Sequence, residues 1–510
     1  MVAQRRVVVV GGGVSGLATA YHLTRERSEG ADGEDGARRG GAPRGGGAPV
    51  QVVVLEGAPQ LGGRIATRTV AGTRVDAGPD AVLVRSPAVA GLLTELGLDP
   101  LLRAPAGGGA YLWSRGRLRP LPPGSVFGVP QRLWPLLRSG LLGPLGFVRA
   151  GADLVLPRRA AGGDPTIEQL LRPRFGRQVF ERLVEPMLGG VHAGRAGRLS
   201  ARSAVPEVAA LADGHRSLYL ALRGREPKPG PRRGPGPGPA PRPALMTLDG
   251  GLSVLVDTLR DAVVAAGGQV RTGARVTSLT RLAAGPGPGG AGYRLTGTGF
   301  DPLEADEVVL ATPAGEAGRL LHPLAPAATA ALEAIRYAGV ATVLLAYRPQ
   351  DLPPLPAGTG FLTPPVEGRL LVGCTWLTAK WPHLRSGLRS GLQQDPVLVR
   401  AMVGRDGDQA WAGLDDAALV AAVRAELAEA MGLHAEPVDV VVRRMPGAMP
   451  QYTVGHADRL AAADRALAGL PGVHLTGAGY RGVGISGCLA QAAVTADAVR
   501  RRAGEPVGAR

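Results

Sequence analysis

Two glycine-rich segments of the chain have the spacing of a phosphate-binding turn. Residues 11–16 have the sequence GGGVSG and directly follow the apolar run RVVVV, whereas residues 477–482 have the sequence GAGYRG. Both fit Gly-x-Gly-x-x-Gly, in which a turn and the N-terminus of the next helix direct backbone N–H groups at a dinucleotide pyrophosphate. The chain therefore holds either two dinucleotide sites or one site built from both segments.

The first segment has the context that this motif requires, because it lies between a strand pattern and a helix pattern. Gly11 permits the tight turn, Gly13 lets the backbone approach the pyrophosphate, and Gly16 lets the helix pack closely on the sheet. A glycine-rich turn without a ligand is the alternative interpretation. The candidate cofactor residues of this segment are Gly11, Gly12, Gly13, Val14, Ser15 and Gly16.

The next strand pattern, VQVVVLE at residues 50–56, ends in an acid. Glu56 is placed to accept hydrogen bonds from ribose hydroxyls, and a Gly-rich insert before the strand accounts for its long distance from the first turn. Leu-Gly-Gly-Arg follows, in which Gly62 and Gly63 allow a second close backbone approach and Arg64 adds a cation near the diphosphate. An acid followed by this string indicates FAD rather than NAD.

The second glycine segment does not fit another Rossmann unit, because that unit would need a further strand carrying an acid. A helix pattern at residues 488–503 follows it instead. We therefore expect the strand GVHLT to join the N-terminal sheet and the turn at 477–484 to pass beside the flavin. The next helix then directs its N-terminus at the flavin N1/C2=O edge, where its dipole favours the negatively charged reduced form. The residues expected along the flavin are Val483, Gly484 and Ile485, together with the turn of Gly78, Pro79, Asp80 and Ala81, although that second pattern alone predicts only a turn.

The elements that must position these residues alternate between strand and helix patterns, which predicts an α/β fold with a parallel sheet. Strand patterns occupy residues 6–10, 50–56 and 472–477, and helix patterns occupy 14–26, 252–268, 415–433 and 488–503. At 510 residues the chain is long enough for two or three domains.

Charge and composition limit the partners. The formal net charge of +16 favours an anionic partner, which could be nucleic acid, acidic lipid or a polycarboxylate, and abundant Arg in the inserts is the alternative explanation. Aromatic residues make up only 4%, which argues against stacking of bases. The chain shows no metal-ligand spacing and has two distant cysteines, so we expect no metal and a reducing compartment. No apolar run is long enough to span a bilayer.

Gly- and Pro-rich inserts at residues 28–47 and 224–243 are predicted to be disordered, because such compositions bury too little apolar surface. A basic tail for nucleic acid is the alternative for the second insert. Residues 112–156 are apolar, broken by Pro and Gly, and interspersed with Arg. This stretch is either a cap over a pocket or a surface that contacts a membrane peripherally.

Longer strings make the chain resemble the protoporphyrinogen/coproporphyrinogen oxidases of the flavin amine oxidase superfamily. The resemblance covers nearly the whole chain except the inserts, and the strings GVHAG and MPQYTVGH are most similar to the Gram-positive coproporphyrinogen III oxidases. The strings are EPMLGGVHAGRAGRLSARSAVPEV (185–208), MTLDGGLSVLVDTL (246–259), CTWLTAKWPHL (374–384), MPQYTVGHADRL (449–460) and LPGVHLTGAGYRGVGISGC (470–488).

The resemblance implies a Rossmann-like FAD-binding domain of the glutathione-reductase/amine-oxidase type, a mixed-sheet substrate domain and a helical domain. It also implies a backbone contact from Val276 to adenine, although an ordinary strand residue is the alternative. Related enzymes often carry Trp near the flavin at the position of Met445, where this chain differs. The implied ranges are 1–71, 248–312 and 449–510 for the FAD domain, 72–111, 223–247 and 313–448 for the substrate domain, and 112–222 for the helical domain.

The activity implied is oxidation of coproporphyrinogen III in the cytoplasm, with dioxygen as acceptor and peroxide as product. Because the flavin supplies the hard chemistry, we nominate no catalytic residue and interpret His192 and His456 as structural. Arg85 is the first candidate to bind propionates, since the guanidinium fork suits carboxylates, and a solvated surface Arg is the alternative. Contact with the next haem-pathway enzyme is a further expectation. The rival functions are protoporphyrinogen IX oxidation and a non-catalytic nucleic-acid or porphyrin-binding protein; we expect no nucleic-acid partner.

Overall fold

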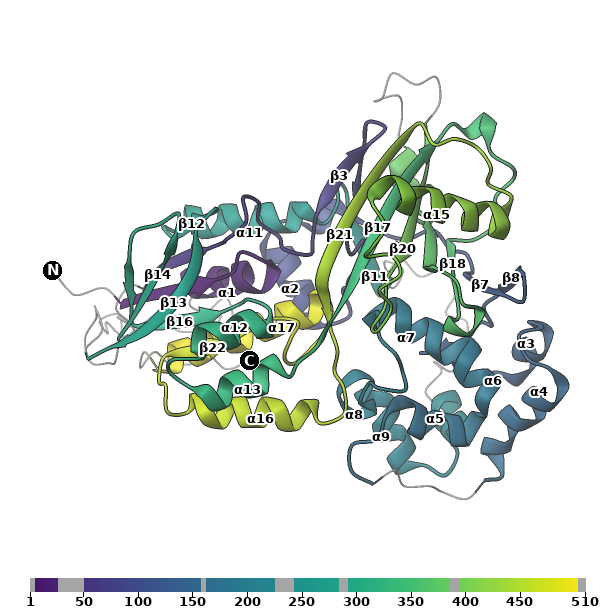
Figure 1. The fold of residues 1–510 in the computed structure, drawn as a ribbon, viewed down its shortest axis with the longest axis horizontal. Helices are drawn as coiled ribbons and strands as arrows, with labels where there is room; N and C mark the ends of the chain where they lie inside the picture. The colour runs from purple at the N-terminus through teal and green to yellow at the C-terminus, as the bar shows by residue number, and fades with distance from the viewer. Residues whose placement is uncertain are drawn as a thin grey trace, which may run out of the picture.

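The computed structural model of the protein describes residues 5–25, 50–156, 162–224, 243–283, 292–385 and 395–502. The segments predicted to be disordered, 28–47 and 224–243, lie outside the described residues except for their terminal positions 224 and 243. Figure 1 shows a lobe with a central parallel sheet, a second lobe dominated by the long strands β17 and β21, and a helical lobe below the second.

A five-stranded parallel sheet forms the first lobe. Its order is β12-β2-β1-β16-β22, so the N-terminal strand is central and a strand from the C-terminal part of the chain forms one edge. The prediction that GVHLT joins the N-terminal sheet is therefore confirmed. The bounds are β12 (Gln269–Arg271), β2 (Val50–Leu55), β1 (Arg5–Val10), β16 (Glu307–Leu310) and β22 (Val473–Leu475).

Both faces of this sheet are covered, which explains why β1 is a continuous apolar run. Val7 and Val9 pack on one side with three helices, α1 (Val14–Thr24), α11 (Ser253–Ala265) and α17 (Ile485–Arg502). Val8 and Val10 pack on the other side, against a small antiparallel sheet and three helices. These are β13 (Arg275–Leu282), β14 (Gly292–Thr298), β15 (Leu303–Ala305), α12 (Ala314–Leu321), α13 (Pro326–Glu333) and α16 (His456–Leu467).

The second lobe contains a seven-stranded sheet in the order β21-β17-β20-β19-β18-β7-β8. The pair β18 and β7 is parallel and the other pairs are antiparallel, so the sheet is mixed as predicted. Its strands are β21 (Asp439–Pro450), β17 (Tyr337–Tyr347), β20 (Val397–Val403), β19 (Leu371–Trp376), β18 (Gly360–Leu362), β7 (Tyr111–Ser114) and β8 (Arg117–Pro120), accompanied by α14 (Leu377–Lys380), α15 (Asp416–Met431), η4 (Pro349–Asp351), η5 (Pro365–Glu367) and η6 (Pro382–Arg385).

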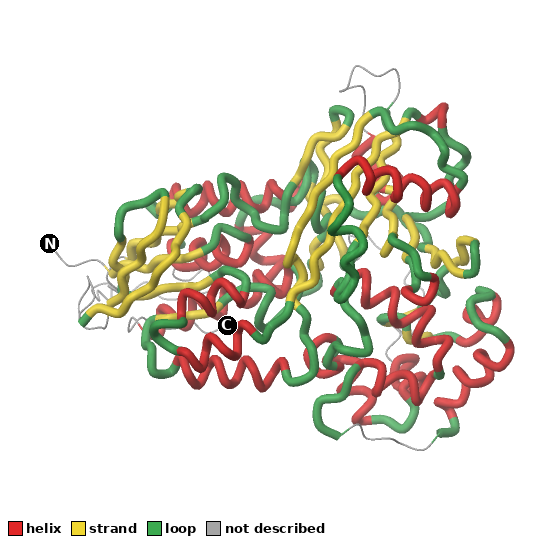
Figure 2. The backbone as a smooth tube through the Cα atoms, in the orientation of Figure 1, coloured by secondary structure: helices red, strands yellow, loops and turns green. Residues whose placement is uncertain are grey.

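The third lobe is built mainly from short helices around its own apolar core, and Figure 2 shows how little strand it contains. The predicted helical range 112–222 begins inside β7, whose hairpin with β8 belongs to the seven-stranded sheet. The elements are β9 (Ser125–Val126), β10 (Val129–Pro130), α3 (Leu133–Arg138), α4 (Pro144–Gly151), η2 (Ala152–Leu154), α5 (Ile167–Phe175), α6 (Arg177–Val179), η3 (Phe180–Val184), α7 (Glu185–His192), α8 (Ala201–Ala204), α9 (Pro206–Gly214) and α10 (Leu218–Gly224).

Short elements connect the first lobe to the other two. The hairpin of β3 (Thr67–Val70) and β4 (Thr73–Asp76) packs on the face of the seven-stranded sheet opposite α15. A three-stranded sheet joins β5 (Val82–Leu83), β11 (Leu245–Leu248) and β6 (Leu102–Arg103), beside α2 (Pro87–Glu95) and η1 (Asp99–Leu101). Among the described residues, no helix has both the length and the apolar character needed to cross a bilayer.

Candidate cofactor site

The glycine turn after β1 contains two kinds of glycine. The backbone geometry requires glycine at Gly11 and Gly16 but not at Gly13. Gly11 has a φ of +113°, and a Cβ on Gly16 would lie 1.9 Å from the carbonyl oxygen of Gly11. Gly13, by contrast, has an ordinary φ of −73°, and a Cβ there would meet no atom within 4 Å. The backbone at Gly13 therefore faces open space at the N-terminus of α1, where a pyrophosphate would lie in a dinucleotide fold.

Glu56 lies one residue beyond β2 and its carboxylate holds the turn. Oε2 accepts a hydrogen bond from the backbone N–H of Gly12 at 2.7 Å, and Oε1 accepts one from Ala58 N–H at 2.8 Å. The side chain is half-buried, so the carboxylate is fixed beside the turn and keeps further acceptor capacity. Its contact with ribose hydroxyls stays a prediction.

The second glycine pair lies directly on the first turn. Gly62 N–H donates to the carbonyl of Gly12 at 2.9 Å. A Cβ added to Gly63 would lie 3.7 Å from the Cα of Gly13, which is ordinary van der Waals contact. The guanidinium of Arg64 lies 5.8 Å from the centre of the Tyr337 ring. The predicted phosphate-facing residues Gly13, Gly63 and Arg64 are thus neighbours in space.

The C-terminal glycine-rich segment and helix α17 lie beside the first glycine turn. Helix α17 packs on α1, with Leu17 and Leu489 in one core. Cys488, in the first turn of α17, is buried, and the side chain of Ser15 in α1 lies close enough to lower the pKa that burial raises. The structure therefore brings the two glycine-rich segments together, so one site built from both replaces the alternative of two sites.

The residues predicted nearest the flavin lie at the start of α17. Gly484 has a φ of +91°, is exposed, and a Cβ on it would meet no atom within 4 Å. Val483 is half-buried, and Ile485 is the first residue of the helix, which begins three positions earlier than the pattern suggested. The open side of Gly484 resembles that of Gly13, and contact of these residues with the cofactor stays a prediction.

The Gly-Pro-Asp turn is fixed by cations that the sequence did not single out. Asp80 accepts hydrogen bonds from Lys380 Nζ at 2.9 Å and from the Trp381 indole N–H at 3.0 Å, and it pairs with Arg400 Nη2 at 3.1 Å. Arg400 also donates to the carbonyl of Gly78 at 2.8 Å. Burial alone would raise the pKa of Asp80, but Arg400 and Lys380 lower it well below its usual range. The Asp80 side chain therefore anchors the turn to the seven-stranded sheet.

Arg443 on β21 holds the second glycine pair in a similar way. Its guanidinium donates to the carbonyl oxygens of Arg64 and Gly63, both at 2.8 Å. The string CTWLTAKWPHL contained Lys380 and Trp381 without suggesting a role for them. Arg400 and Arg443 had no signal in the sequence, because the backbone carbonyls that both contact, and the Asp80 carboxylate that Arg400 also contacts, are distant in sequence.

The remaining candidates are spread around this centre. Val276 on β13 is half-buried, and the residue Ala274 just before that strand donates from its N–H to the Glu56 carbonyl at 2.8 Å. Met445 is half-buried on β21, opposite Val340 on β17. Arg85 and Ala81 flank β5; Arg85 is exposed and Ala81 is half-buried. Pro79 is half-buried within the turn that Arg400 and Asp80 fix.

Burial favours the neutral form of five titratable side chains, those of Cys488, Tyr337, Tyr452, His192 and His456. Burial raises the pKa of the Cys488 thiol and of the Tyr337 and Tyr452 hydroxyls. Burial lowers the pKa of His192 to about 4, and it also lowers that of His456. Such surroundings suit a cofactor that carries its own reactivity, with the protein supplying orientation and exclusion of water.

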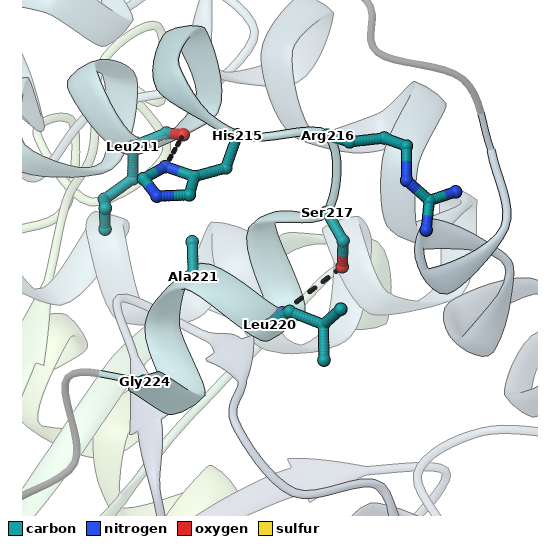
Figure 3. A pocket seen from close by; sticks show the side chains of 7 residues that line it. All are labelled: Leu211, His215, Arg216, Ser217, Leu220, Ala221 and Gly224. Carbon is teal, nitrogen blue, oxygen red and sulfur yellow. Dashed lines mark hydrogen bonds between the residues drawn. The ribbon is translucent and has the colours of Figure 1, made fainter.

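A hollow of about 530 Å³ lies between α9 and α10, and Figure 3 shows the side chains around it, including His215, Arg216 and Ser217. None of the predicted cofactor or substrate residues lines it, and its rim ends at Gly224, where the described chain is interrupted. We therefore do not assign it to the cofactor site.

The parallel sheet, the glycine turn and the C-terminal closure define an FAD-dependent oxidoreductase. Comparison with family models identifies the family: the chain belongs to the flavin-containing amine oxidoreductases, whose model matches residues 14–500. The predicted fold class, cofactor and family are thereby confirmed. An open cradle at Gly13 and Gly484 fits the dinucleotide, and residues of the glycine turns and of the α17 N-terminus would hold it.

Three individual proteins are similar over almost their whole length. The chain is 31% identical to the coproporphyrinogen III oxidase of Bacillus subtilis (strain 168), over 96% of each sequence. It is 35% identical to the coproporphyrinogen III oxidase of Mycobacterium tuberculosis (strain ATCC 25618 / H37Rv), again over 96% of each. A crystal structure from Exiguobacterium sp. 255-15, provisionally named a protoporphyrinogen oxidase, superposes with a TM-score of 0.81 at 28% identity, covering 98% of this chain and 100% of that one.

Proposed function

We propose that the protein oxidises coproporphyrinogen III to coproporphyrin III, with dioxygen as the final acceptor and hydrogen peroxide as product. The observation that carries this proposal is the full-length similarity to coproporphyrinogen III oxidases. The predicted cofactor turns agree with it, since they are intact and meet at one place. Six electrons leave the substrate, which requires three dioxygen molecules and yields three of peroxide.

Bound FAD supplies the acceptor for hydride from a methylene bridge of the porphyrinogen. The protein's own part is to bind and orient. The α17 N-terminus and the 477–484 turn would hold the flavin, and Arg64 would offset diphosphate charge. Arg400 and Arg443 fix the turns at Gly78 and Arg64 that would support the bound cofactor. Arg85 binds a substrate propionate. No side chain is assigned a proton transfer.

The direct test is anaerobic mixing of the yellow holoprotein with coproporphyrinogen III. We expect bleaching of the flavin absorbance, and on admission of oxygen its return together with porphyrin fluorescence and peroxide. A flavin that stays oxidised in the presence of substrate would contradict the proposal.

Protoporphyrinogen IX is the rival substrate, favoured by the name of the similar Exiguobacterium structure. The two porphyrinogens differ in carboxylate number, four against two. Comparison of kcat/KM for both substrates on one preparation decides between them. A higher value for protoporphyrinogen IX would replace the proposed substrate while leaving the flavin chemistry unchanged.

We also propose that the stretch 112–156 contacts a membrane surface peripherally. Large apolar side chains are exposed there, with Trp134 60%, Leu145 84% and Val148 70% accessible. Arg138 lies 4.8 Å above the Trp134 ring, so basic and apolar groups share this surface. Co-sedimentation with anionic vesicles should be lost in the double variant Trp134→Ser, Leu145→Ser, and binding that persists in it would exclude this surface. Contact with the next haem-pathway enzyme stays a prediction.

A further inference from the structure

The sequence of the turn at 477–484 does not by itself fix the backbone conformation of the turn. Four of its eight residues are glycine, and Gly477, Gly482 and Gly484 have φ values of +128°, +148° and +91°. Glycine-rich backbone loses more conformational entropy on ordering than other sequences do. A fixed conformation beside the cofactor therefore needs support from outside the turn.

Tyr452 supplies that support from the segment between β21 and α16. Its hydroxyl donates to the carbonyl of Ala478 at 2.8 Å and accepts from the N–H of Gly482 at 2.9 Å. One oxygen atom thus bridges two points of the turn four residues apart. The Tyr452 side chain is only 3% exposed, and Ala478 and Gly482 are half-buried, so the bridge lies at the edge of the packed interior.

His456 fixes Tyr452 and a third point of the turn. The two rings stack with centroids 4.0 Å apart and an interplanar angle of 16°. His456 Nε2 lies 2.9 Å from the carbonyl oxygen of Tyr480, and since a carbonyl only accepts, Nε2 carries the proton. Gln491 accepts from the N–H of Gly477 at 3.0 Å at the start of the turn.

We propose that Tyr452 is a positioning residue, which with His456 holds the 477–484 turn in the conformation that binds the flavin. The inference rests on the proposed placement of this turn along the cofactor. Loss of the Tyr452 hydroxyl would leave the turn to be ordered by the cofactor itself, and that ordering cost weakens binding. The relaxed turn would also place fewer N–H groups against the reduced flavin, so the midpoint potential should become more negative.

The test compares Tyr452→Phe with Tyr347→Phe, a control that removes a buried hydroxyl at the far end of β17. For Tyr452→Phe we expect the FAD dissociation constant of the apoprotein to rise about tenfold, together with a changed flavin spectrum and a more negative potential. Tyr347→Phe should remain within about twofold of the wild type, well below that tenfold change. His456→Phe, which keeps the stacked ring but cannot donate to Tyr480, is the second variant and should shift the same quantities in the same direction.

The outcomes separate two possible errors. Gly13→Val fills the proposed pyrophosphate space and should weaken FAD binding at least about 100-fold. If Gly13→Val also binds FAD normally, the cofactor placement itself is wrong. If Gly13→Val shows that loss, while Tyr452→Phe and His456→Phe keep the wild-type affinity and potential, only the role of Tyr452 is overturned. Equal losses in Tyr347→Phe and Tyr452→Phe would also overturn it.

Discussion

Ser486 and Leu83 exchange two hydrogen bonds although 403 residues separate them along the chain. The Ser486 hydroxyl donates to the Leu83 carbonyl at 2.8 Å and accepts from the Leu83 N–H at 3.1 Å. Ser486 lies in the first turn of α17, and Leu83 ends β5 just beyond the Gly-Pro-Asp turn. The two segments predicted to flank the flavin are thereby joined to each other.

Replacement of Ser486 by Ala should weaken FAD binding, because both backbone groups of Leu83 lose their partner. A net loss of about 1 kcal/mol corresponds to roughly a fivefold rise in the dissociation constant. Titration of apoprotein with FAD, followed by fluorescence quenching, measures it. Ser486→Thr keeps the hydroxyl and serves as the control. Wild-type affinity in Ser486→Ala would show that this exchange does not support the site.

Gly13 and Gly16 should respond differently to enlargement. Gly13→Val should leave the thermal midpoint of the apoprotein almost unchanged, because its side chain enters open space and its φ suits any residue. FAD affinity should fall at least about 100-fold, or about 2.7 kcal/mol. Gly16→Ala should instead lower the midpoint of the apoprotein, since its Cβ would collide with the Gly11 carbonyl. A reversed pattern would contradict the assignment of the open space to the cofactor.

Asp80→Asn should strongly destabilise the protein, because Lys380 and Arg400 would remain buried beside an uncharged partner. Removal of one member of a buried pair typically costs about 3–5 kcal/mol. Chemical denaturation of the apoprotein measures the change. The exposed pair of Glu316 and Arg319 provides the control, since Glu316→Gln should cost less than about 1 kcal/mol. Equal effects of the two substitutions would refute a structural role for the Asp80 cluster.

His192 should make the protein less stable in acid. Burial lowers its pKa from 6.5 to about 4, so between these values the unfolded chain binds the proton and the folded chain does not. Stability therefore rises with pH across this window and falls as the pH drops from about 6.5 to 4, by up to about 1.4 kcal/mol per pH unit for one proton. The difference in unfolding free energy between pH 5 and pH 7.5 should be smaller in His192→Phe than in the wild type. An unchanged difference would show that His192 is not the titrating group.

Arg85→Gln should raise the KM for coproporphyrinogen III about tenfold with little change in kcat, as expected when binding common to substrate and transition state is removed. Arg85→Lys should show a smaller increase, because an ammonium keeps the charge but not the fork. Steady-state assays by porphyrin fluorescence provide both parameters. If KM is unchanged in Arg85→Gln, Arg85 is a solvated surface residue.

The parts of the fold that the sequence predicted are those with local signals. Strand β1, the glycine turn and α1 are contiguous in the sequence, and their apolar run and glycines predict a strand, a turn and a helix in that order. The closure by β22 and α17 was also predictable, because the second glycine segment lacked the acid-bearing strand of an independent unit. The boundary at residue 112 was less accessible, since the β7–β8 hairpin joins the seven-stranded sheet through a pairing with β18 that is remote in sequence.

The glycines of the candidate site could be predicted from the sequence, but the side chains that hold the glycine turns in place could not. The spacing of Gly11 and Gly16 in the sequence was enough to predict the backbone constraints at these two positions. Arg400, Arg443 and Tyr452 act on carbonyl and N–H groups brought near by tertiary packing, and any sequence can supply such groups. Asp80 illustrates the difference: its turn was recognised, but its three partners came from β20 and from a string with no assigned role.

The order of strands in the parallel sheet also bears on how the protein is made. β22 pairs with β16 and α17 packs against α1, so the nucleotide cradle is completed by the segments translated long after its glycine turn. A nascent chain carries an unfinished sheet, with β16 as an open edge, during most of its synthesis. If α17 completes the FAD site as proposed, we expect cofactor loading to follow synthesis of α17, and a chain that lacks α17 to be colourless and prone to aggregation.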